Sequence, residues 1–235
     1  MPALDLRELT IEYTVAGYSV RPVDALDLHA RAGSLTILLG PSGCGKTSLL
    51  SSLGGILTPQ HGRITFGGID VTALEGRALL EYRRRTVGIV FQGFNLVPSL
   101  SALENVMVPM RAARMSRREA LVRALALLER VDLAEKAHHR PGQLSGGQQQ
   151  RVAVARAIAL APPLLLADEP TAHLDYRQVE GILGLLRQLA SGERVVVVAT
   201  HDQRLLPLAD QVVELGAHVA DAGRPEELVD ASARL

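Results

Sequence analysis

The sequence has a single cysteine, no tryptophan and only two lysines, Lys46 and Lys136, among its 25 basic residues. One cysteine, Cys44, excludes an internal disulfide and favours a reducing compartment. The basic residues are balanced by 25 acidic ones, so the chain lacks the excess positive charge with which proteins bind many nucleic-acid phosphates. We therefore expect no nucleic-acid partner.

Long hydrophobic runs are also missing. No stretch reaches the roughly 18 uncharged apolar residues of a membrane-spanning helix, and residues 1–5 lack the basic and apolar regions of a signal peptide. The densest apolar run, residues 195–199, has the length and β-branching of a buried parallel strand. The sequence predicts a cytosolic chain, or one that only a partner holds at a membrane.

Short apolar runs alternate with helical patterns, which predicts an α/β fold with a largely parallel sheet. Strands are expected at residues 4–13, 25–30, 35–39, 63–66, 87–91, 164–167, 194–199 and 211–215. Helices are expected at residues 46–53, 102–108, 116–130, 147–160 and 225–235, the third beginning with a Ser116–Glu119 capping box. The helical character of residues 93–160 indicates a subdomain inserted between strands of the core.

The segment GPSGCGKT at residues 40–47 fits the pattern G-x-x-x-x-G-K-[ST], between a predicted strand and a predicted helix. Its glycines let successive backbone N–H groups face one anion, and the helix start adds its positive dipole end. Lys46 would reach the β- and γ-phosphates, and the Thr47 hydroxyl would ligate Mg²⁺. The residues expected to hold the nucleotide here are Gly40, Pro41, Ser42, Gly43, Cys44, Gly45, Lys46, Thr47 and Ser48. The plainer alternative is a Gly-rich turn with an incidental lysine.

Two carboxylates, Asp168 and Glu169, end the apolar run at residues 164–167. In P-loop NTPases an acidic residue at such a strand end holds the Mg²⁺ shell, a role that we assign to Asp168. Glu169 would point elsewhere and act as the general base for the attacking water. Two acids that merely cap the following helix are the alternative, which the preceding phosphate-binding pattern disfavours.

Residues 144–148, LSGGQ, decide the class, because they resemble the signature motif of the ABC superfamily, and residues 149–157 continue its pattern. Ser145, Gly146 and Gly147 precede an apolar-striped helix, so their N–H groups would form a second anion-binding helix start, with Gln148 beside them. An ordinary Ser N-cap followed by flexible glycines is the alternative for the pentapeptide alone.

Further landmarks follow the family order. Gln92 matches the Q-loop glutamine, which the resemblance places at the Mg²⁺ and water site, and His201 matches the H-loop histidine, which contacts the γ-phosphate. Tyr13 aligns with the aromatic residue that stacks on adenine, with Tyr18 as the second candidate, and either could be a plain strand aromatic. Residues 172–175 occupy the D-loop, where His173 departs from the usual small residue. Cys44 replaces a common serine, most simply as a tolerated small residue.

The resemblance covers about residues 9–215 and implies a P-loop NTPase (RecA-like) core with an antiparallel β subdomain, residues 1–92 and 161–235, and an α-helical subdomain, residues 93–160. It further implies an ATPase that binds ATP and Mg²⁺ and forms a head-to-tail homodimer, in which the Gly-rich loop of one copy faces the signature of the other. An integral membrane permease would contact the region Gln92–Val106 and hold the chain at the cytoplasmic face of the inner membrane. The arginines at 83–85 are expected to form a solvated face rather than a partner surface.

The segment 91–106 and the residues after Asp168 most resemble the lipoprotein-releasing and macrolide-exporting branch, which works by mechanotransmission. An importer ATPase is the second interpretation and a cell-division homologue the third. Chromosome-maintenance and DNA-repair ATPases are disfavoured because residues 48–143 contain neither heptads nor cysteine pairs. Ribosome-acting members usually carry two cassettes, whereas this chain has one.

Overall fold

The computed structural model describes residues 2–15, 18–172, 174, 176–190 and 192–216. Its centre is a parallel sheet with the strand order β6-β7-β8-β3-β9. These strands are β3 (Leu35–Leu39), β6 (Val87–Val90), β7 (Leu164–Asp168), β8 (Val195–Thr200) and β9 (Gln211–Glu214). This confirms the predicted parallel sheet, and it brings the ends of β3, β7 and β8 to one edge.

A second, antiparallel sheet has the order β2-β1-β4-β5. Its strands are β1 (Leu4–Val15), β2 (Tyr18–Ala30), β4 (His61–Phe66) and β5 (Ile69–Asp70). The register between β1 and β2 shifts three times, and Glu8 and Ala25 take positive φ values of 46° and 45°, as expected where bulges bend a ribbon. The antiparallel β subdomain is therefore confirmed, with β2 beginning well before the predicted residue 25.

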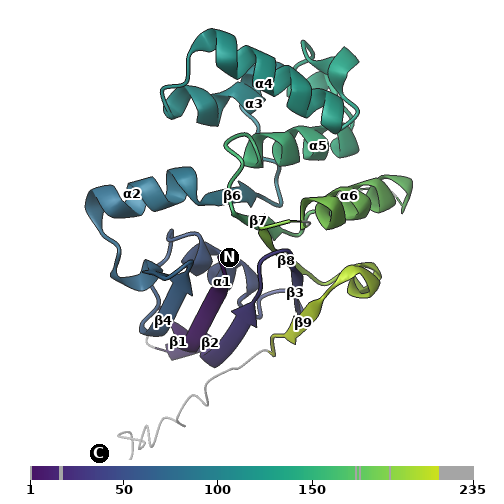
Figure 1. The fold of residues 1–235 in the computed structure, drawn as a ribbon. Coiled ribbons are helices and arrows are strands. Elements are labelled where there is room, and N and C mark those ends of the chain that lie inside the picture. Colours follow the sequence, from purple (N-terminus) through teal and green to yellow (C-terminus); the bar gives the residue numbers. More distant parts are fainter. Residues whose placement is uncertain (1, 16–17, 173, 175, 191, 217–235) are drawn as a thin grey trace, which may run out of the picture.

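The helices inserted between β6 and β7 gather at the end of the molecule opposite this second sheet (Figure 1). Between β6 and β7 the chain forms α3 (Ala102–Ala112), α4 (Arg117–Arg130), η2 (Ala134–Lys136), η3 (Pro141–Gln143) and α5 (Gly146–Ala157). The remaining helices are α1 (Lys46–Leu53), η1 (Val71–Ala73), α2 (Gly76–Arg85), α6 (Tyr176–Leu189) and η4 (Gln203–Leu208). The inserted helical subdomain is confirmed.

The parallel sheet separates two hydrophobic cores because successive side chains of a strand point to opposite faces. In β7, Leu165 and Ala167 join the core that contains the inserted helices and α6. Leu164 and Leu166 join the core formed with α1 and the antiparallel sheet. A strand buried on both faces cannot shift easily, so the carboxylates at its end are held in fixed positions.

Two helices, α2 and α6, have no counterpart in the sequence prediction. Helix α2 buries only Tyr82 and is otherwise rich in exposed arginine, so its apolar signal is weak. Helix α6 buries Val179, Ile182 and Leu186, a spacing of three and four residues that is typical of a helix. This spacing is visible in the sequence and would predict the helix.

No helix within the described residues is both long and apolar enough to cross a membrane. His173 and the helix expected at residues 225–235 lie outside the described residues.

Candidate phosphate-binding site

The loop between β3 and α1 follows a path that only glycine permits at two positions. Gly45 has a φ of 98°, and a Cβ atom there would lie 2.6 Å from Pro22 Cβ. A Cβ atom on Gly40 would lie 2.5 Å from the Leu215 carbonyl oxygen. Both distances are below contact, so a side chain at either position would displace the loop.

Helix α1 begins without a side-chain cap among the described residues. By contrast, α3, α4 and α5 each begin with a complete capping box, at Ser101, Ser116 and Ser145. The first N–H groups of a helix have no partner within the helix. Those of α1 are consequently available to an external anion, which the helix dipole also favours.

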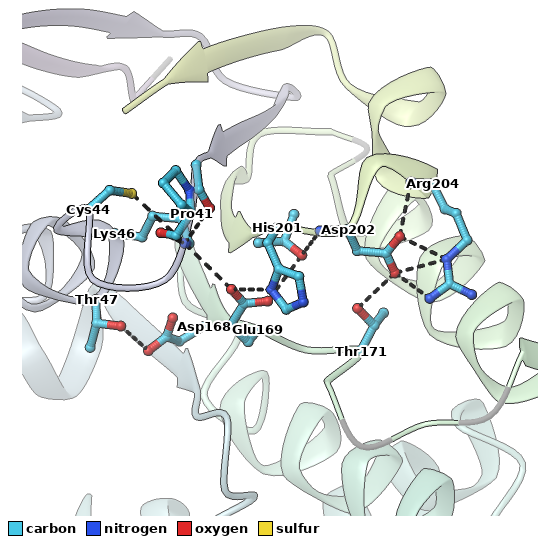
Figure 2. A network of polar contacts seen from close by, with 12 residues as sticks. Pro41, Cys44, Lys46, Thr47, Asp168, Glu169, Thr171, His201, Asp202 and Arg204 are labelled. Carbon is cyan, nitrogen blue, oxygen red and sulfur yellow. Dashed lines mark hydrogen bonds and ion pairs between the residues drawn. The ribbon is translucent and has the colours of Figure 1, made fainter. Parts of the chain in front are cut away.

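Lys46 lies folded back over this loop and is only 6% exposed. Its Nζ donates hydrogen bonds to the carbonyl oxygens of Gly40 at 2.7 Å and Pro41 at 2.9 Å. The same nitrogen lies 3.7 Å from Glu169 Oε1 (Figure 2). The cation thus rests between the phosphate loop and a carboxylate, with partners that a phosphate could replace.

Thr47 and Asp168 meet beside Lys46, since Thr47 Oγ1 donates to Asp168 Oδ2 at 2.8 Å. The other oxygen, Asp168 Oδ1, is buried without a hydrogen-bond partner among the described residues. Burial raises the pKa of the Asp168 carboxyl above its usual value, and Glu169 adds to this, while Thr47 and Lys46 oppose it. A hydroxyl and a carboxylate with an unused oxygen fit the oxygen ligands that Mg²⁺ prefers.

Glu169 turns away from Asp168 because its backbone adopts a φ of 43°, in the left-handed region. Its N–H donates to the Ala199 carbonyl oxygen at 2.8 Å, which holds this turn against β8. Its side chain contacts His201 Nδ1 at 3.0 Å through Oε1 and accepts from Thr200 Oγ1 at 3.2 Å through Oε2. Figure 2 shows the Glu169 side chain between Lys46 and His201, whereas the side chain of its neighbour Asp168 points toward Thr47.

These groups surround a cavity of about 240 Å³. The residues that line it are Ser42, Gly43, Gly45, Lys46, Thr47, Ser48, Gln92, Glu169 and His201. The structure therefore brings Gln92 and His201 to the predicted loop. The lining of the cavity is mostly polar, with the cation of Lys46 on one side and the carboxylate of Glu169 on the other, which suits a charged group such as a phosphate.

The signature residues do not belong to this lining in the part of the chain described. Ser145 caps α5, since its Oγ accepts from the Gln148 N–H and its own N–H donates to Gln148 Oε1. The N–H of Ser145 thus already has a hydrogen-bond partner, whereas the sequence predicted that it would be free to bind an anion. Gly147 packs so closely on Gln178 that a Cβ atom would lie 2.7 Å from its Cδ.

Neither Tyr13 nor Cys44 belongs to the described lining of this cavity. Tyr13 is 36% exposed on β1, paired with Val20, and does not line the cavity among the described residues. Its proposed stacking on adenine stays a prediction, and the side chain of Tyr18 lies outside those described. Cys44 is buried, with Sγ 3.9 Å from Lys46 Nζ, which supports the simple interpretation of a tolerated small residue.

Several functional contacts had no assigned role in the sequence analysis. Thr200 Oγ1 donates to Glu169 and accepts the Asp202 N–H at 3.0 Å. Asp202 in turn binds Arg204 and accepts from Thr171 Oγ1 at 3.3 Å, and the pKa of its carboxyl is lowered, chiefly by the bond from Arg204 (Figure 2). The hydroxyl at the end of an otherwise aliphatic strand was the one local sign of this network.

Asp168→Asn is expected to stabilise the nucleotide-free protein at neutral pH, by about 0.5–2 kcal/mol. Folding raises the pKa of this carboxyl, so the protonated group favours the folded state. This contribution is fully present at pH values below the pKa of the unfolded chain. That contribution is lost as the pH rises through the raised folded pKa, so the ionised Asp168 opposes folding at neutral pH. Thermal unfolding with and without Mg²⁺ and ATP would measure both effects, since the variant should lose most of the Mg²⁺-dependent gain. A lower melting temperature in both conditions would contradict this prediction.

Comparison with known proteins agrees with this geometry. A family model described as ABC transporter matches residues 23–172. An ABC transporter ATP-binding protein of Mycobacterium tuberculosis is 64% identical over 229 residues, covering 97% of this chain and 69% of the relative. The lipoprotein-releasing system ATP-binding protein LolD of Anaeromyxobacter dehalogenans is 44% identical, covering 94% of each.

A macrolide export ATP-binding/permease protein, MacB of Hyphomonas neptunium, is 39% identical over 96% of this chain and 35% of that protein. Among solved structures, the dimeric cassette MJ0796 in a post-hydrolysis state with ADP and Pi has a TM-score of 0.84 and 37% identity. That match covers 92% of this chain and 96% of the other.

Proposed function

Because this chain belongs to the ABC transporter family, we propose that it is an ATP-hydrolysing subunit that drives a separately encoded membrane permease. The observation that carries the proposal is the joint lining of one cavity by Lys46, Thr47, Glu169 and His201. A cation, a hydroxyl, a base and an orienting imidazole are the groups that phosphoryl transfer to water requires.

Lys46 and the N–H groups that begin α1 would bind the β- and γ-phosphates of ATP. In the nucleotide-free protein Lys46 instead bonds the Gly40 and Pro41 carbonyl oxygens and lies beside Glu169. When Lys46 turns to the phosphates, Glu169 loses a nearby positive charge.

Glu169 would accept the proton of the attacking water, while Thr200 and His201 hold its two oxygens in place. When His201 Nδ1 carries a proton, it donates to Oε1 of Glu169. Gln92 is exposed at the cavity, where its amide would help to orient the water. Mg²⁺ would neutralise charge that develops on the phosphate oxygens, and Thr47 and Asp168, with Gln92 nearby, would hold it.

A second copy of the chain would complete the site. The described lining of the cavity contains none of Ser145, Gly146, Gly147 or Gln148. The N–H groups of Gly146 and Gly147 begin α5, so a phosphate from the opposite copy could bind there. The dimeric form of the related solved cassette supports the presence of a second copy.

The membrane permease would contact the region Gln92–Val106 and hold the chain at the cytoplasmic face of the inner membrane. The similarity to LolD and MacB supports an exporter or mechanotransmission partner over an importer. Core boundaries at residues 92/93 and 160/161 would then separate the part that binds ATP from the helical part that moves with the signature.

The test is phosphate release by the purified chain with ATP, with and without Mg²⁺, and then with the co-reconstituted permease. We expect hydrolysis that requires Mg²⁺ and increases with the permease. Stimulation by DNA or ribosomes without stimulation by a membrane protein would contradict the proposed partner. Absence of any ATP binding would contradict the enzymatic function itself.

A further inference from the structure

The signature helix α5 ends against the strand that leads to Gln92. In Figure 1, α5 lies between the pair α3 and α4 and the strands β6 and β7. Gly88 in β6 is buried, and a Cβ atom there would lie 2.3 Å from the Ala157 carbonyl oxygen, so the last turn of α5 packs directly on the backbone of β6. Strand β6 ends at Val90, shortly before Gln92. The C-terminal end of the signature helix is therefore fixed close to the Gln92 segment.

Arg156 extends this contact past the end of β6. It lies in the last turn of α5, and its guanidinium donates to the carbonyl oxygens of Phe94, at 2.7 Å, and Asn95. A cation in the last turn also interacts favourably with the negative end of the helix dipole. Burial lowers the pKa of the Arg156 guanidinium, and no carboxylate pairs with it among the described residues. The two carbonyl oxygens are thus the contacts that offset its loss of hydration.

The turn that Arg156 binds has a backbone conformation that side chains adopt with difficulty. Phe94 and Asn95 have φ values of 60° and 49°, in the left-handed region. This conformation is costly for a bulky residue such as phenylalanine, and it persists where surrounding contacts hold it. Asn105, which is fully buried, holds the far side of the turn, since its Oδ1 accepts from the Val97 N–H at 2.8 Å. Arg156 holds the near side.

The same helix carries the signature at its other end. Ser145 caps α5 and Arg156 lies in its last turn, so about 16 Å of helix separates the two residues, at 1.5 Å per residue. Gln92 lines the phosphate cavity of its own copy, whereas the signature lies outside that lining among the described residues. One helix thus connects the Gln92 side of the site with the residues that would meet the nucleotide of a second copy.

We propose that Arg156 is a positioning residue, which holds Gln92 at the phosphate cavity and makes the Gln92 turn and the signature helix move as one unit. The inference rests on the proposed function, and it adds the side chain through which the two ATP sites of a dimer affect each other. Without Arg156, the turn at residues 93–95 would lose a contact that stabilises its left-handed backbone. Gln92 would then leave the cavity more often, and the orientation of the signature helix would no longer depend on it.

Hydrogen–deuterium exchange of the nucleotide-free protein tests the position of the turn. The N–H groups of Phe94 and Asn95 donate to the carbonyl oxygens of Phe91 and Gly93, so their exchange reports opening of the turn. In Arg156→Ala this exchange should be at least about tenfold faster than in the wild type, because two bonds from a charged donor are lost. Arg156→Lys keeps the charge without the guanidinium fork and should give an intermediate rate.

Arg194→Ala is the matched control. Arg194 is also half-buried, burial also lowers the pKa of its guanidinium, and it donates to the carbonyl oxygens of Pro162 at 2.9 Å and Leu189 at 3.1 Å. It precedes β8 at the end opposite to Thr200, away from the described lining of the phosphate cavity. The control should lower the melting temperature as Arg156→Ala does and leave exchange in the turn unchanged. Equal acceleration in both variants, or none in Arg156→Ala, would overturn the proposal.

A second experiment tests the coupling to the signature with a readout other than hydrolysis. Each alanine variant is combined with Glu169→Gln, and size-exclusion chromatography measures the ATP concentration at which half of the protein is dimeric. Arg156→Ala should raise this concentration roughly tenfold, since a misplaced signature binds the opposite nucleotide less well, whereas Arg194→Ala should leave it unchanged. The same concentration for both would refute the coupling. If Glu169→Gln alone forms no dimer with ATP, the proposed second copy is wrong, and the exchange experiment still decides whether Arg156 positions the turn.

A double-mutant cycle with Gln92 separates positioning from a general loss of stability. The ATPase rates of Gln92→Ala, Arg156→Ala and the double variant are compared at saturating ATP and Mg²⁺. If Arg156 acts through Gln92, its replacement should slow hydrolysis much less in the Gln92→Ala protein than in the wild type, because residues of one network do not contribute additively. Fully multiplied losses would contradict the positioning role. Absence of ATP binding by the wild type would count instead against the proposed function.

Discussion

Replacing Glu169 with glutamine is expected to slow ATP hydrolysis at least about 100-fold while ATP still binds. The amide keeps the shape of the side chain, and its oxygen can still accept from Thr200 or His201. It cannot accept the proton of the attacking water, so the chemical step loses its base. Phosphate release and equilibrium ATP binding, measured on the same preparation, would separate the two effects.

The stalled variant should also accumulate as a dimer with ATP, because the γ-phosphate that joins the two copies is not removed. Size-exclusion chromatography with ATP would detect the dimer. Glu180→Gln, at an exposed glutamate of α6, is the matched control and should hydrolyse ATP normally and remain without a stable dimer. Near-normal turnover of Glu169→Gln would assign the base to another group.

Lys46→Ala is expected to weaken ATP binding at least about 30-fold, since loss of one partner of a buried charge pair costs about 2–5 kcal/mol. Lys46 is buried, and its ammonium group is the cation nearest to the α1 helix start within the described cavity lining. Isothermal titration with ATP would measure the change. The Lys46→Ala variant should fail at ATP binding, whereas Glu169→Gln should bind ATP and fail at the chemical step.

Lys136→Ala is the natural control, because Lys136 is the other lysine of the chain and lies in η2, away from the cavity. It should bind ATP as the wild type does. Unfolding of Lys46→Ala is checked by its melting temperature without nucleotide. Unchanged ATP affinity in a folded Lys46→Ala protein would rule out the assigned role.

Local patterns were enough to predict much of the site. The loop at residues 40–47 needs glycines at close backbone approaches, and Gly45 indeed has the left-handed φ that such a loop requires. A strand buried on both faces needs continuous hydrophobic residues, so the apolar run before the acidic pair predicts such a strand with the two carboxylates at its end. Each of these signals lies within a few residues, where spacing directly determines geometry.

Contacts between distant segments were not predictable in the same way. Nothing near Arg156 in the sequence indicates that its guanidinium binds the carbonyl oxygens of Phe94 and Asn95, about sixty residues earlier. The weak apolar pattern of α2, in which Tyr82 is the buried residue, gave no clear sign of that helix. Such contacts depend on how whole elements pack, and packing is decided by many weak interactions together.

The sequence by itself determined the family, the nucleotide-binding loop and the positions of most strands and of the inserted helices along the chain, because these depend on short patterns and local backbone limits. The tertiary structure alone decided which oxygens of Glu169 face Thr200 and His201, and why Asp168 keeps one oxygen unused. It also decided that Ser145 caps its own helix. Those outcomes depend on distances between residues far apart in the chain. Only the packing of the two sheets and their helices sets these distances.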